Sequence, residues 1–86
     1  MDKNLDYTMK FEGIQQEKMR VEDAIKIVYE SLKIKGYNPI NQLIGYLLSG
    51  DSSYITSYNN AREIIRQFER DEILEEVITK YLEESR

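Results

Sequence analysis

The hydrophobic positions along the chain recur at the spacing of α-helices. Over residues 17–35 they predict one apolar helical face, made of Val21, Ala24, Ile25, Val28 and Leu32. Ile27 and Ile34 lie off this face, two turns apart, and they favour a second contact surface for a partner chain. Lys35 followed by Gly36 is typical of a helix end, because a cation complements the last turn and glycine allows the exit.

A second helix is predicted from residue 39 to about residue 49. Asn38 is a good N-cap residue, and Pro39 suits the first helical position. Its expected buried face consists of Ile40, Leu43, Ile44, Leu47 and Leu48. Gly45 lies in mid-helix, where glycine costs about 1 kcal/mol relative to alanine, so a close helix–helix approach is expected there. Gly50 follows the last apolar pair and predicts the helix end.

The region after this helix is predicted to be a polar loop, residues 51–59, whose apolar side chains fold over the core: Tyr54, Ile55 and Tyr58. Asn60 with Glu63 three residues later is typical of a capping box, which predicts a third helix over residues 61–69. That helix is expected to bury Ile64, Ile65 and Phe68.

A last helix is predicted over residues 71–84, with Asp71 as a cap or as part of a continuous helix. Its apolar face comprises Ile73, Leu74, Val77, Ile78, Tyr81 and Leu82. The other positions are mostly acidic, and acids early in a helix favour its positive N-terminus. The pattern leaves open whether residues 61–84 form one bent helix or two.

Together these segments predict an all-α fold, a compact bundle of four or five short helices. Residues 16–86 form a single helical domain, and residues 1–15, which lack periodicity, form a flexible N-terminal arm. A chain of 86 residues buries only about 60–65% of its unfolded surface. It has neither cysteine nor histidine, which excludes disulfides and the usual zinc ligands and leaves self-association as the common source of added stability. We therefore expect a helical homodimer.

The seven tyrosines support the same expectation. Tyrosine is enriched at interfaces because it buries a ring while its hydroxyl stays in water. For Tyr29, Tyr46 and Tyr81 taken singly, a place in the core is the favoured interpretation.

Charge and missing residue types restrict the function. The net charge of −4 disfavours nucleic acid and anionic membranes as partners. Catalytic triads need histidine or cysteine, and the four glycines are too scattered for a phosphate loop. Adjacent acids such as Glu75 and Glu76 point apart on a helix, towards water. The sequence thus predicts no enzyme, no cofactor and no metal; without an export signal or an apolar span, the expected location is the cytoplasm.

Arg62, Arg66 and Arg70 recur at four-residue spacing and are the candidate partner contact. One interpretation is a nucleic-acid-binding face. Intrahelical pairing is the favoured alternative, because Arg66 has Glu63 three residues before it and Glu69 three residues after it.

Several motifs resemble the IreB family of small bacterial regulators. The main one is the segment from Lys35 to Asp51, with the pattern GYNPINQ followed by GY and SGD. Its hallmark residues are Gly36, Tyr37, Asn38, Pro39, Asn41, Gln42, Gly45, Tyr46, Gly50 and Asp51. Residues 58–62 and 68–76 add to the likeness, which covers about residues 8–82.

The resemblance implies a dimeric, non-enzymatic regulator in Gram-positive bacteria. Its implied partners are a transmembrane Ser/Thr kinase of the cell-envelope stress type, the matching phosphatase and an unknown downstream protein. Its implied role is negative regulation of cephalosporin resistance. Family members are phosphorylated on threonine in the N-terminal arm, and Thr8 matches one such position. A second threonine position falls near Leu5, so Thr8 is the phosphorylation candidate here.

Overall fold

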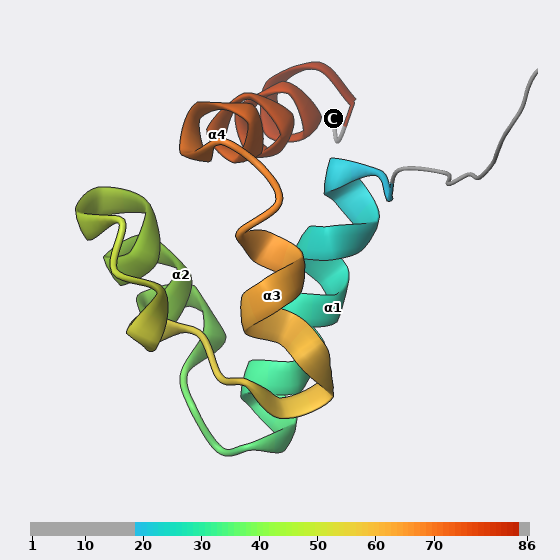
Figure 1. Ribbon diagram of the computed structural model, residues 1–86. Coiled ribbons are helices and arrows are strands. Elements are labelled where there is room, and N and C mark those ends of the chain that lie inside the picture. Colours follow the sequence, from blue (N-terminus) through green and yellow to red (C-terminus); the bar gives the residue numbers. More distant parts are fainter. Residues whose placement is uncertain (1–18, 85–86) are drawn as a thin grey trace, which may run out of the picture.

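The computed structural model describes residues 19–84, and every regular element among them is helical. In chain order these are α1 (Val21–Ile34), α2 (Pro39–Ser49), η1 (Ser52–Tyr54), η2 (Tyr58–Asn60), α3 (Ala61–Ile65), α4 (Arg70–Thr79) and the π-helical η3 (Lys80–Glu84). The predicted all-α fold is confirmed. Figure 1 shows α1 beside α3, with α2 flanking them on one side and α4 lying across one end.

Helix α1 is the central element, because α2, α3 and α4 all pack against it. It begins at Val21 and not at residue 17, since Arg20 has extended backbone angles. Its end follows the prediction. Gly36 takes a positive φ of 87°, and the Tyr37 N–H donates to the Leu32 carbonyl at 2.9 Å while the Gly36 N–H donates to Lys33. This is a Schellman motif, which satisfies carbonyls that the helix leaves open.

The core runs through one side of α1 and is closed by α3, the loop before α3 and the start of α4. Its buried apolar members are Ala24, Val28, Leu32, Tyr46, Ile55, Ala61, Ile65, Phe68 and Ile73. The core positions predicted on α1 are confirmed at Ala24, Val28 and Leu32, whereas Val21 and Ile25 are half-buried. The loop prediction is confirmed for Ile55, which is fully buried, but Tyr54 and Tyr58 are exposed.

One polar side chain, Ser31, is buried within this core. Its hydroxyl is sealed from solvent and has no hydrogen-bond partner among residues 19–84. An unpaired buried hydroxyl costs about 1–3 kcal/mol, and serine is also a weaker helix former than alanine. Ser31→Ala is therefore expected to raise the free energy of unfolding by about 1 kcal/mol, measured by urea titration. A loss of stability would contradict this and would show that the hydroxyl is paired.

Helix α2 starts as predicted, with the Asn38 side chain accepting a hydrogen bond from the Asn41 N–H at 3.1 Å and Pro39 in the first turn. It ends at Gly50, which has φ 76°. The expectation for Gly45 is corrected. A Cβ at this position would lie 2.5 Å from the Tyr54 ring, so an aromatic side chain of η1, not a second helix, lies where that Cβ would be.

Gly45→Ala is expected to destabilise the fold by about 1 kcal/mol, because the Tyr54 ring must leave its place for the new methyl group. In a Tyr54→Ala background the same change is expected to stabilise by about 0.5–1 kcal/mol, since only the helix-propensity gain remains. A double-mutant cycle of unfolding free energies measures this coupling. Additive effects would mean that the ring does not restrict residue 45.

Residues 61–84 do not form one bent helix: α3 is separate from α4, and α4 is followed directly by η3. Helix α3 ends at Ile65, and residues 66–69 are not helical. Asn60 lies at the N-cap position of α3, as predicted, but the predicted capping box with Glu63 is wrong. Asn59 and Asn60 both have positive φ, and the Asn60 side chain makes no capping bond in the described structure. The capping box lies instead at Glu69 and Glu72, which start α4.

The largest correction concerns the outer faces of α2 and α4. Of the residues predicted to be buried on α2, Ile40, Ile44 and Leu48 are exposed, while Leu43 and Leu47 are half-buried. On the C-terminal helix only Ile73 is buried, and Tyr81, placed in the core by the sequence, is 74% exposed. Both helices have apolar residues on more than one side, and among residues 19–84 only one side of each is covered.

Candidate functional site

The hallmark segment builds the connection from α1 to η1. Gly36, Asn38, Pro39 and Gly50 set the ends of the two helices. The Gln42 side chain donates to the Tyr54 carbonyl at 2.9 Å, and Tyr46 is buried. Tyr37 and Asn41 expose their side chains. Most of these residues therefore shape the fold, and the structure does not gather them into a polar pocket.

Asp51 ends this segment and caps η1. Its carboxylate accepts hydrogen bonds from the Ser53 N–H at 3.0 Å and the Ser53 hydroxyl at 2.8 Å. These two donors, the backbone N–H foremost, lower the pKa of Asp51. The carboxylate acts locally, in fixing the turn after α2.

The three candidate arginines have separate partners. Arg62 donates through Nε to the Ile55 carbonyl at 2.8 Å, and Arg70 donates to the Leu47 carbonyl at 3.0 Å near the end of α2. Arg66 lies 3.5 Å from the carboxylate of Glu63, one of its two predicted partners. Arg62 and Arg70 thus bind backbone carbonyls outside their own helices, which spacing along the sequence does not reveal.

The outer side of α2 carries an apolar stripe, Ile40, Ile44 and Leu48, at four-residue spacing. Leu48 is 81% exposed and Ile44 is 48% exposed. No residue from Pro39 to Ser49 is charged. A contiguous exposed apolar stripe of this kind typically marks a protein-interaction surface. We call these three residues the α2 stripe.

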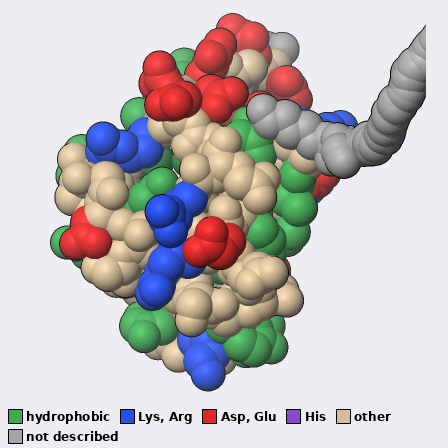
Figure 2. Space-filling view, viewed as in Figure 1, with side chains coloured by type: hydrophobic (Ala, Val, Ile, Leu, Met, Phe, Trp, Pro, Cys, Tyr) green, Lys and Arg blue, Asp and Glu red, His purple; other side chains and the backbone are tan. Residues whose placement is uncertain are grey.

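The second apolar face lies on α4 and η3, and its exposed members are Leu74, Val77, Ile78, Tyr81 and Leu82. Its surroundings differ from those of the α2 stripe, because residues 70–84 include six acidic and two basic residues, a net charge of −4. Figure 2 shows the acidic side chains gathered over the end of the molecule where α4 lies. This face therefore suits a partner that is both apolar and basic.

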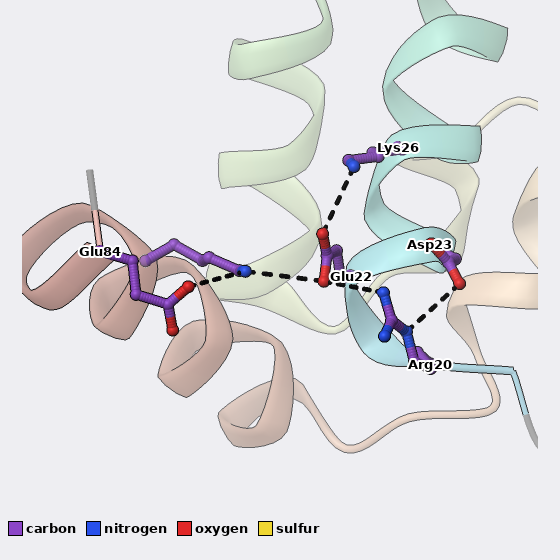
Figure 3. Close-up of polar contacts among 6 residues, drawn as sticks. Arg20, Glu22, Asp23, Lys26 and Glu84 are labelled. Atoms are coloured by element: carbon purple, nitrogen blue, oxygen red, sulfur yellow. Dashed lines mark hydrogen bonds and ion pairs between the residues drawn. The ribbon is translucent and has the colours of Figure 1, made fainter.

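Ion pairs join the start of α1 to the C-terminal helix. The Lys80 ammonium lies 2.9 Å from Glu84 and 3.6 Å from Glu22, and Glu22 also pairs with Lys26 at 3.4 Å and Arg20 at 3.1 Å. Figure 3 shows the Glu22 carboxylate between Lys26 and Arg20. The hydrogen bond from Lys26, with the charge of Lys80, lowers the pKa of Glu22, and the hydrogen bond to Glu84 raises the pKa of Lys80.

Two hollows flank this network between α1 and the C-terminal helix. The first is about 450 Å³ and is lined by Glu22, Ile25, Lys26, Glu76, Val77, Lys80 and Tyr81. The second is about 310 Å³ and is lined by Val21, Glu72, Glu75, Glu76 and Thr79. Glu76 borders both. We call the first the apolar cleft, because most of its lining surface is apolar although charged residues contribute to it, and the second the acidic groove, because three of its five lining residues are glutamates.

The phosphorylation candidate Thr8 lies outside the described residues, as does the whole segment predicted to be an arm, residues 1–15. Within residues 19–84 no helix is long and apolar enough to cross a membrane, and no cluster of three acidic side chains has a metal-binding arrangement. The residues of the two apolar faces were predicted to be buried, and they are instead exposed or half-exposed. Ile34, which lies off the main apolar face of α1, is 64% exposed.

Comparison with known proteins decides the family. Residues 6–83 match the family described as IreB regulatory phosphoprotein. The chain belongs to the IreB family. A "UPF0297 protein" of Clostridioides difficile (strain 630) is 73% identical to it over 82 residues, which cover 95% of this chain and 96% of that protein. The resemblance found in the motifs is thereby confirmed, and membership of the IreB family supports a regulatory role for the chain.

Proposed function

We propose that this IreB-family protein is a non-enzymatic cytoplasmic regulator that acts through protein–protein contacts. In this proposal it is a homodimer, and a transmembrane Ser/Thr kinase and its phosphatase control the phosphate on Thr8. The modification alters contacts with a downstream protein in cell-envelope stress and cephalosporin resistance. The observation that carries the contact mechanism is the pair of exposed apolar faces on so small a domain.

Charge favours the α2 stripe as the dimer interface. In a two-fold symmetric dimer the same patch of each copy meets its counterpart, so like charges would face one another. The stripe lies on a helix without charged residues, whereas the C-terminal face lies among residues with a net charge of −4. Pairing α2 with α2 therefore buries apolar side chains without charge repulsion.

Phosphorylation of Thr8 is tested by incubating the full chain with the cognate kinase and radiolabelled ATP, beside Thr8→Ala. Incorporation into the parent chain and its loss in the variant support the site. Equal labelling of both chains would overturn it.

Nucleic-acid binding by the Arg62, Arg66 and Arg70 side is the less well supported alternative. Two of these guanidinium groups already donate to backbone carbonyls, and the third pairs with a carboxylate. A salt-sensitive mobility shift with DNA or RNA would favour this alternative. Absence of a shift at low salt would end it.

A further inference from the structure

We propose that the segment Tyr7–Phe11 of the same chain docks between α1 and the C-terminal helix, with Phe11 in the apolar cleft and Lys10 in the acidic groove. Phosphate on Thr8 would then release the segment. This inference extends the proposed function by naming the surface that the modification acts on, and the release step rests on Thr8 being the modified residue.

The two hollows have complementary properties and adjoin at Glu76. Ile25 and Val77 supply apolar surface to the cleft, whereas the groove brings together three carboxylates and no cation. Their volumes, about 450 and 310 Å³, fall in the range of about 300–1,000 Å³ that is typical of ligand pockets. An occupant that suits both hollows has an aromatic or aliphatic side chain next to a basic one.

In the sequence before α1, Lys10 and Phe11 are the adjacent basic and aromatic residues. Tyr7–Phe11 reads YTMKF, a stretch with two aromatic residues, one lysine and no acid. Acids lie on both sides of it, at Asp6 and Glu12. The acidic groove and the apolar cleft share Glu76, so their occupants must be neighbouring side chains. Lys10 and Phe11 are adjacent in the sequence and meet this condition.

The point where the described chain begins also favours this occupant. Met19 is two residues before Val21, which lines the groove, and three before Glu22, which lines the cleft. Seven residues lie between Phe11 and Met19, and the eight residue steps that join the two can span up to about 26 Å. A short tether gives an effective concentration in the millimolar range, which favours docking within one chain over capture of a separate peptide.

Phosphate on Thr8 would oppose this docking for a simple electrostatic reason. Thr8 is two residues from Lys10, so its phosphate would lie near the groove formed by Glu72, Glu75 and Glu76. A phosphothreonine carries a charge of about −1.5 to −2 at neutral pH, and next to carboxylates it disrupts by repulsion. The switch therefore needs no change in the helical core.

The absence of cysteine makes a paramagnetic test clean. A nitroxide on Glu12→Cys of the full chain is expected to broaden the amide signals of Val77 and Thr79 in isotope-labelled protein. Phe11→Ala, Lys10→Glu and Thr8→Glu are each expected to abolish that broadening. The matched controls Leu5→Ala and Lys3→Glu are expected to retain it.

Broadening confined to the first residues of α1 would overturn the proposal, because the tether alone produces it. Broadening that survives Phe11→Ala would overturn it as well. In a mixture of spin-labelled unenriched chains and unlabelled enriched chains, the effect on Val77 is expected to vanish; its persistence would assign the occupant to a second copy and contradict docking within one chain. The Thr8→Glu measurement does not depend on a kinase. Failure of the kinase to label Thr8 would therefore contradict only the proposed modification, and failure of Tyr7–Phe11 to dock would contradict only this inference.

Discussion

Replacing Ile55 by alanine is expected to destabilise the protein by about 3–5 kcal/mol, the upper part of the range for a large aliphatic core residue. Ile55 is fully buried, although it lies between η1 and η2 and not on a helix. The Arg62 Nε–H donates a hydrogen bond to the Ile55 carbonyl. Both the side chain and the backbone of Ile55 are therefore fixed to the rest of the fold. A small domain has only about 5–15 kcal/mol of stability in total, and this loss therefore leaves a large unfolded population.

The measurement is urea unfolding followed by circular dichroism, at one fixed protein concentration because self-association also adds stability. Ile55→Val is expected to cost about 0.5–1.5 kcal/mol, which gives a graded series. Ser57→Ala, at an exposed position of the same loop, is the control and is expected to stay within about 0.5 kcal/mol of the parent. An Ile55→Ala loss no larger than that of the control would contradict the assignment of Ile55 to the core.

Capping and turn residues in the sequence predicted the helix ends that depend on interactions between near neighbours in the chain. The α1 end at Gly36 and the α2 start at Asn38 and Pro39 follow from backbone conformations and hydrogen bonds within a few residues. The third helix begins at Ala61 as predicted, but its predicted capping box and its predicted end at residue 69 were wrong for the opposite reason. Asparagine is a residue type that favours the N-cap position, but Asn59 and Asn60 have left-handed backbone angles. The capping box forms at Glu69 instead, at the start of α4. Here the path of the chain overrides the local preference.

The candidate site was harder to predict, because periodicity shows which residues are apolar but not which of their faces is covered. Ile73 and Ile78 belong to the same apolar face in the sequence, yet one is buried and the other is 52% exposed. The partners of Arg62 and Arg70 are also non-local, since each donates to a carbonyl of another segment. The cleft and groove need the C-terminal helix to lie against α1, which no single helical segment encodes.

Ile44→Glu is expected to convert the proposed dimer into a folded monomer. The side chain is about half exposed on the α2 stripe, so the monomer tolerates the carboxylate, but an α2–α2 interface would bury two of them. At about 2 kcal/mol for each buried and unpaired carboxylate, two copies weaken the dimer by roughly a thousandfold. Sedimentation velocity over a range of concentrations measures the change, and circular dichroism checks that the helices remain.

The matched control is Ile78→Glu, which places the same charge on the other apolar face at a position of similar exposure. It is expected to leave the dimer intact, because the acidic surroundings of α4 make that face unsuited to meeting its own copy. The reverse pattern, a monomer with Ile78→Glu and a dimer with Ile44→Glu, would move the interface to the C-terminal helix. That helix borders the apolar cleft, so the docking of Tyr7–Phe11 would then compete with self-association, and the two experiments together separate these arrangements.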